Sequence, residues 1–198
     1  MDPSQWQQWL MSPRPNGWPT RVGELMPADL ASCLAIDNGP GVRHPLDATG
    51  FLSKERLALL IEALLHAGSG EWMIAYWDGW SGIEPTLRET YGERPFRLRL
   101  PLRDYWAVQI GLDDLIKIAG IGTHPVFIGP SLLAANDRSV LVAGDVDWPT
   151  TYVGFASAAA RAALMRSLES QGVSVETCDA LSPLPGYSST ANPRENPA

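Results

Sequence analysis

Several features are scarce in this chain of 198 residues, and each scarcity excludes a class of protein. There are only two cysteines, Cys33 and Cys178, and they lie far apart. We therefore expect two buried thiols in a reducing cytoplasm rather than a disulfide scaffold. No run of about eighteen apolar residues occurs, so no membrane span is predicted. The N-terminus lacks a basic region followed by an apolar stretch, so no signal peptide is predicted, and we expect a cytoplasmic protein.

Positive charge is also scarce. Lys and Arg together number 15 against 22 Asp and Glu, which gives a net charge of −7. Nucleic-acid binding needs clustered Lys and Arg, so a nucleic-acid partner is not expected. A basic protein partner is compatible with this charge, although a mildly acidic balance is common among soluble proteins.

Motifs for metal, phosphate or nucleophile chemistry are missing as well. His44, His66 and His124 are scattered, without an HExxH pattern or a cysteine at zinc spacing. No phosphate loop, EF-hand loop or GxSxG nucleophile motif occurs. We therefore expect no cofactor and no metal, and the sequence singles out no catalytic residue.

The most informative stretch runs from Arg138 to Gly154. Val140–Ala143 is a short apolar run, which predicts a central strand buried on both faces. Asp145 and Asp147 then alternate with apolar residues, so one face turns polar before Pro149 interrupts the ladder. A strand is expected to resume at Thr151–Val153.

Other elements follow from periodicity and turn residues. Helices are predicted over 27–37, 54–67 and 113–119, and in a long segment that begins after the N-cap Ser157. Strands are predicted over 72–77, 96–100, 105–110, 126–128 and 173–178, with a hairpin turn at Asp78-Gly79 and a loop over 83–95. This order predicts an α+β fold, with a mainly antiparallel sheet and helices packed on one face.

The chain is predicted to form one domain with a segment at each end. Residues 1–24 form a loop-rich arm after a short helix at Ser4–Met11, and the arm is pinned by Trp6, Trp9 and Trp18. Residues 25–181 form the α+β domain. Residues 182–198 are rich in Pro and Ser, and we expect them to be disordered.

The candidate binding surface combines carboxylates with tryptophans. Aromatic residues beside a turn are suited to protein recognition, and acids can attract a basic partner. Two alternatives need no binding function: the aromatic residues pack across neighbouring strands, and the acids line a solvated strand face. We predict a non-enzymatic protein-binding domain, with an acidic and aromatic face made of Trp77, Asp78, Trp80, Asp145, Asp147 and Trp148.

An enzyme is the alternative function. Asp145 and Asp147 lie two residues apart on a strand, so their side chains point the same way. Two such carboxylates could perform acid–base chemistry or bind a divalent metal in a small hydrolase-type enzyme. A compact pocket in which these acids and His44 converge would favour this alternative.

A series of short motifs resembles a family of uncharacterised actinobacterial proteins. The series is Arg43-His44-Pro45, Trp77–Trp80, Arg103–Tyr105, Pro130–Leu132, Asp137–Ser139, Asp145–Asp147 and Thr151–Gly154. The resemblance covers roughly residues 40–180, and it departs from the family pattern at Leu133–Asn136. It implies no established activity. A looser resemblance, to SUKH-type immunity proteins, implies an acidic α+β domain that binds a toxin.

Overall fold

A computed structural model describes residues 1–11, 19, 21–38, 52–65, 70–101, 103–111, 114–115, 122–123, 126–127, 129–144 and 148–184. At its centre is an eight-stranded sheet with the order β10-β1-β9-β8-β7-β2-β4-β3, in which every pair is antiparallel. The strands are β1 Ser32–Asp37, β2 Trp72–Trp77, β3 Phe96–Arg99, β4 Asp104–Ile110, β7 Leu132–Ala135, β8 Val140–Ala143, β9 Thr150–Phe155 and β10 Val175–Cys178. The short strands β5 Gly122–Thr123 and β6 Val126–Phe127 pair only with each other.

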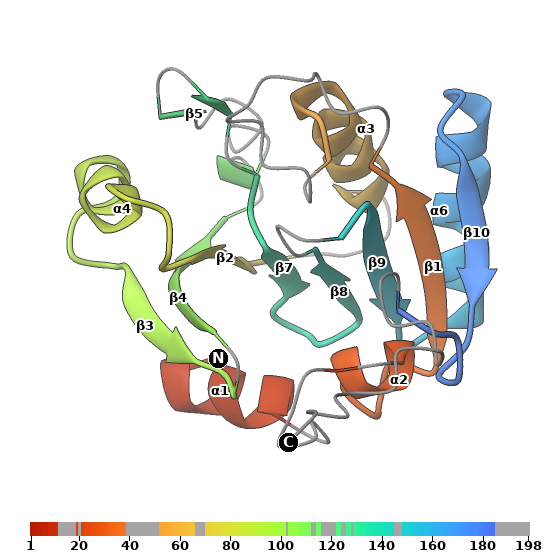
Figure 1. Ribbon diagram of the computed structural model, residues 1–198, viewed down its shortest axis with the longest axis horizontal. Helices are drawn as coiled ribbons and strands as arrows, with labels where there is room; N and C mark the ends of the chain where they lie inside the picture. Colours follow the sequence, from red (N-terminus) through yellow and green to blue (C-terminus); the bar gives the residue numbers. More distant parts are fainter. Residues whose placement is uncertain are drawn as a thin grey trace, which may run out of the picture.

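Helices cover both faces of the sheet (Figure 1). The helices are α1 Pro3–Met11, α2 Val22–Leu25, α3 Lys54–Leu65, α4 Ile83–Tyr91 and α6 Ala158–Ser170. The apolar residues of α3, α4 and α6 share one core with one face of the sheet, and those of α1 and α2 share a second core with the other. The α+β class and the antiparallel sheet are confirmed. Helices are not confined to one face as predicted, because α1, which was expected over Ser4–Met11, and α2 cover the second face.

The alternation of side chains along β2 shows how one strand serves both cores. Trp72, Ile74 and Tyr76 belong to the core beneath α3 and α4, whereas Met73 and Ala75 belong to the core beneath α1. Consecutive strand residues point to opposite faces, so a strand covered on both sides must be apolar throughout. The same reasoning predicted β8, and all of its residues are buried near the middle of the sheet.

Three predicted elements are wrong. Residues 32–37 form β1 rather than the end of a helix, because the segment pairs with both β9 and β10. The loop predicted over 83–95 contains α4, in which Pro85 occupies the first turn, where a missing N–H does no harm. Asp78-Gly79 does not close a hairpin either, since β2 leads into α4 and pairs with β4 and β7.

The N-terminal helices and the last described residues, 182–184, pack on the same face of the sheet. Trp6 and Trp9 of α1 are buried, as predicted for the N-terminal arm, while Trp18 lies outside the described residues. Pro183 forms an isolated antiparallel β-bridge with Arg21, and Leu184 is only 2% exposed. The predicted start of a disordered tail at 182 is therefore too early. Residues 185–198 lie outside the described part of the chain.

Within the described residues, none of the helices has the length and apolar character needed to cross a membrane.

Candidate functional site

Most of the predicted site residues belong to one end of the sheet, which we call the Trp77 end. Here β1, β2, β3 and β8 end, and β4, β7, β9 and β10 begin. The opposite end, with the β7–β8 turn, is the Arg138 end. The described chain has three buried polar residues, Asn38, Ser131 and Thr151, and all three lie at the Trp77 end.

Asn38 is the centre of a buried hydrogen-bond network. Its Oδ1 accepts a hydrogen bond of 2.7 Å from the Thr151 hydroxyl, and its Nδ2 donates one of 3.1 Å to the Trp148 carbonyl. Its backbone N–H donates to the Pro149 carbonyl at 2.9 Å. An unpaired polar group would be costly when buried, so these bonds fix the segment that enters β9.

Gly144 and Trp148, the described residues on either side of 145–147, are both held by contacts. On one side, the Gly144 N–H donates to the Ser131 carbonyl at 2.9 Å. On the other, the Trp148 indole packs edge to face on Tyr152, with 6.2 Å between ring centroids. Burial raises the pKa of Tyr152 to about 12, as expected for a phenol removed from water.

The turn after β2 brings two tryptophans together. Trp77 and Trp80 pack edge to face with ring centroids 5.9 Å apart, and both are half-buried. The backbone N–H of Asp78 donates to the Asp104 carbonyl at 2.9 Å, which ties the turn to the start of β4. The turn therefore presents partly exposed aromatic surface in a fixed position.

Arginines neutralise the acids of this turn. Arg97 Nη2 lies 2.6 Å from Asp78 Oδ2 and 3.0 Å from Asp104 Oδ2. The Arg103 guanidinium carbon lies 4.4 Å from the centroid of the Trp77 ring, a favourable cation–π geometry. The candidate site predicted from the sequence did not include Arg97 or Arg103. The alternation of apolar and basic residues over 96–99 is the signal that could have placed Arg97 on the exposed face of β3.

The structure brings only some of the predicted site residues together. Trp77, Asp78 and Trp80 lie together, but the Asp78 carboxylate is paired with Arg97. Trp148 is only 5% exposed, so its indole supports the sheet and is not available as a surface anchor. Asp145, Asp147 and His44 lie outside the described residues.

The two cysteines form a disulfide, so the prediction of two free thiols is wrong. Cys33 of β1 and Cys178 of β10 are directly opposite in the register of the two strands, with Cα atoms 5.1 Å apart. Strand pairing brings together residues that are 145 positions apart, which spacing in the sequence could not reveal. The cysteines therefore no longer support the expectation of a reducing compartment.

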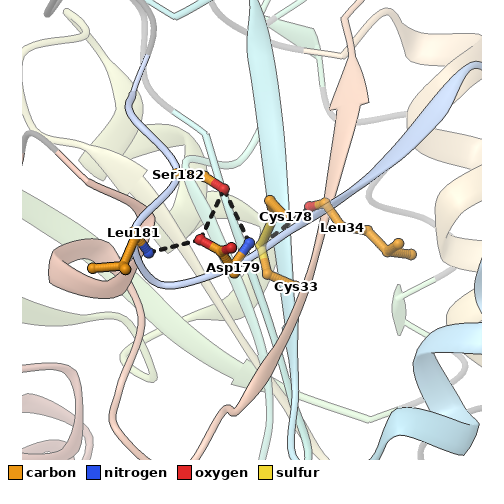
Figure 2. The surroundings of a disulfide bond; sticks show 6 residues. All are labelled: Cys33, Leu34, Cys178, Asp179, Leu181 and Ser182. Atoms are coloured by element: carbon orange, nitrogen blue, oxygen red, sulfur yellow. Dashed lines mark hydrogen bonds between the residues drawn. A yellow bond between two sulfur atoms is a disulfide. The ribbon is translucent and has the colours of Figure 1, made fainter.

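A hydrogen-bonded turn follows the disulfide (Figure 2). Asp179 Oδ1 accepts from the Leu181 N–H at 2.8 Å and from the Ser182 hydroxyl at 3.2 Å. The Gly23 N–H then donates to the Ala180 carbonyl at 3.0 Å. A Cβ at Gly23 would lie 2.7 Å from the Ala180 Cβ, so this close approach requires glycine. The disulfide and this turn together hold the C-terminal segment against α2.

Among the described residues, no group of three or more His, Cys, Asp or Glu side chains is arranged to hold a metal ion. Comparison with known proteins gave no matching family model, no similar curated protein and no similar solved structure. The resemblances noted in the sequence therefore stay predictions.

Proposed function

We propose that the protein is a non-enzymatic binding domain, and that the Trp77 end of its sheet recognises a basic protein partner. The observation that carries the proposal is the buried network around Asn38. It fixes the chain immediately after the segment that contains Asp145 and Asp147. Residues fixed in this way lose little conformational entropy when a partner binds beside them, which favours affinity.

The Trp77–Trp80 turn supports the same proposal. It lies at the same end of the sheet, and its two half-buried indoles offer aromatic surface with few rotatable bonds. Tryptophan is enriched among the residues that contribute most to protein–protein affinity. Arg97 and Arg103 keep the turn in place through ion pairing with Asp78 and stacking on Trp77.

Charge supports a basic partner in particular. Because Asp78 is already paired with Arg97, we assign the attraction to Asp145 and Asp147, which precede Trp148 in the sequence, together with the net charge of −7. Charges of this kind mainly accelerate the encounter of two proteins, and salt weakens their effect. Inhibition of a basic toxin is the specific form of this proposal, and it rests on the resemblance to immunity proteins.

The test is affinity capture from a lysate of the source cells, with three forms of the protein as bait. The first is the natural sequence, the second carries Asp145→Asn with Asp147→Asn, and the third carries Asp2→Asn with Glu71→Gln. The third form makes the same change of charge at exposed positions at the Arg138 end of the sheet, where Met1 and Glu71 hydrogen-bond to Asn136. A basic protein should be retained by the first and third forms and be depleted on the second.

Two results would contradict the proposal. Equal retention by all three folded forms would show that the acids do not take part. Loss of a bound divalent metal from the folded Asp145→Asn/Asp147→Asn form, measured by elemental analysis, would instead support the enzyme alternative.

A further inference from the structure

A cavity of about 360 Å³ opens at the Arg138 end of the sheet, away from the surface proposed above. It lies between α1, the segment after α2 and the β7–β8 turn. The cavity is lined by Gln8, Trp9, Pro27, Ala28, Asp29 and Arg138. Its two ionised side chains carry opposite charges.

The carboxylate in this cavity is held in place by a buried indole. Trp9 Nε1 lies 2.9 Å from Asp29 Oδ1 and 3.0 Å from Asp29 Oδ2, and it donates to both oxygens. Trp9 itself is only 6% exposed, so the donor cannot move far. Each carboxylate oxygen still has lone pairs available for a cation.

Arg138, the basic residue that lines this cavity, has a backbone conformation that disfavours arginine. Arg138 has φ of 62°, and it is the only non-glycine residue with positive φ in the described chain. Asp137 supports the turn, because its Oδ1 accepts from the Ser139 N–H at 2.9 Å. Glycine or asparagine would adopt this conformation at lower cost, so the chain carries the Arg138 side chain here at an energetic cost.

The two charges do not neutralise each other. Within the described part of the chain, neither Asp29 nor Arg138 forms a salt bridge, although both line one cavity. We propose that this cavity binds a small zwitterion with an ammonium group and a carboxylate group, the class to which free amino acids belong. Asp29 would bind the ammonium, and Arg138 would bind the carboxylate through two parallel hydrogen bonds.

The first test is calorimetric titration of the natural protein with each of the common L-amino acids, and with acetate and methylammonium as ligands that carry one charge only. At least one amino acid should bind saturably, and the indole N–H signal of Trp9 should shift in the NMR spectrum. Either Asp29→Asn or Arg138→Gln should weaken that binding at least about tenfold, as expected for loss of a charge-assisted bond. The matched variant Arg166→Gln, which removes an exposed arginine from α6, should leave it unchanged.

The second test uses the backbone strain. Arg138→Gly should raise the melting temperature, because glycine accepts positive φ, and it should abolish amino-acid binding. If Arg138 served only the structure, Arg138→Gly would instead lower the melting temperature. The proposal is overturned if no amino acid binds at millimolar concentrations, or if acetate binds as tightly as the amino acid and Asp29→Asn has no effect.

Discussion

Reduction of the Cys33–Cys178 disulfide should destabilise the protein more than any other single chemical change. The bond closes a loop with a sequence separation of 145 residues. The chain-entropy relation gives about 5 kcal/mol for a loop of that length, and disulfides commonly contribute about 2–4 kcal/mol. We therefore expect the free energy of unfolding to fall by about 2–5 kcal/mol on reduction.

The effect should be concentrated at one edge of the sheet. β10 is an edge strand whose only partner in the sheet is β1, and the turn at Asp179 holds the following segment against α2. Without the disulfide, β10 and this segment should open more often than the central strands. Amide hydrogen exchange should therefore accelerate over 175–184 well before it does in β8.

Urea denaturation with and without dithiothreitol measures the free energy of unfolding and so tests this prediction. The control is Cys33→Ala with Cys178→Ala, whose unfolding midpoint should equal that of the reduced natural protein and should not respond to dithiothreitol. Thiol titration of the unfolded, unreduced protein should detect no free thiol. Two reactive thiols before reduction, or equal midpoints with and without dithiothreitol, would refute the reasoning.

Three further predictions follow from burial. Tyr76→Phe should stabilise the protein by about 1 kcal/mol in urea, because the buried Tyr76 hydroxyl has no hydrogen-bond partner in the described chain. Burial also raises the pKa of Tyr76 and that of Tyr152 in the folded protein. Tyrosines of the unfolded chain ionise above about pH 10, so the free energy of unfolding of the natural protein should fall as the pH rises beyond that value. The Tyr76→Phe variant should lose less stability over the same range. An equally steep loss in both proteins would count against this assignment. Truncation after Leu181 should cost about 1.5–3 kcal/mol, because it removes the buried Leu184, whereas truncation after Leu184 should leave the melting temperature unchanged. Equal melting temperatures for the two truncations would show that Leu184 contributes nothing. Trp148→Ala removes a buried side chain and should lower the free energy of unfolding by about 3–5 kcal/mol. A decrease below about 0.5 kcal/mol would place the indole on the surface.

The parts of the fold that the sequence predicted are those specified by local pattern. β8 and β2 are continuous apolar runs bounded by turn residues, and both were found within a residue of their predicted limits. The stripe of α3 was predicted by apolar spacing, and Leu57, Leu60, Ile61 and Leu64 are buried together. Such patterns fix the type of an element because they follow its own periodicity.

The errors occurred where long-range pairing overrides local pattern. Leu30, Cys33 and Leu34 have helical spacing after Pro27, yet hydrogen bonds to β9 and β10 make this region a strand. α4 was missed because Pro85 was read as a helix breaker, although the first turn tolerates proline. The disulfide was missed because the pairing of β1 with β10 is not visible in the sequence.

The candidate site was predicted only where acids and aromatics follow strand ends. That rule located the Trp77–Trp80 turn, but it could not show that Arg97 pairs with Asp78 or that Trp148 is buried. The Asn38 network was also missed, because its bonds join residues more than 100 positions apart. Polar residues flanking a strand give no local signal of such pairing.

The central claim is that Asp145 and Asp147 steer a basic partner to the Trp77 end of the sheet. The most direct measurement is the association rate constant for the captured partner at low and high salt. It should be made with the natural protein, with Asp145→Asn/Asp147→Asn, and with Asp2→Asn/Glu71→Gln. The Asp145→Asn/Asp147→Asn protein should associate more slowly at low salt, lose most of the salt dependence and keep its unfolding midpoint. If it instead associates at the same rate and with the same salt dependence as the other two, the acids do not form the recognition surface.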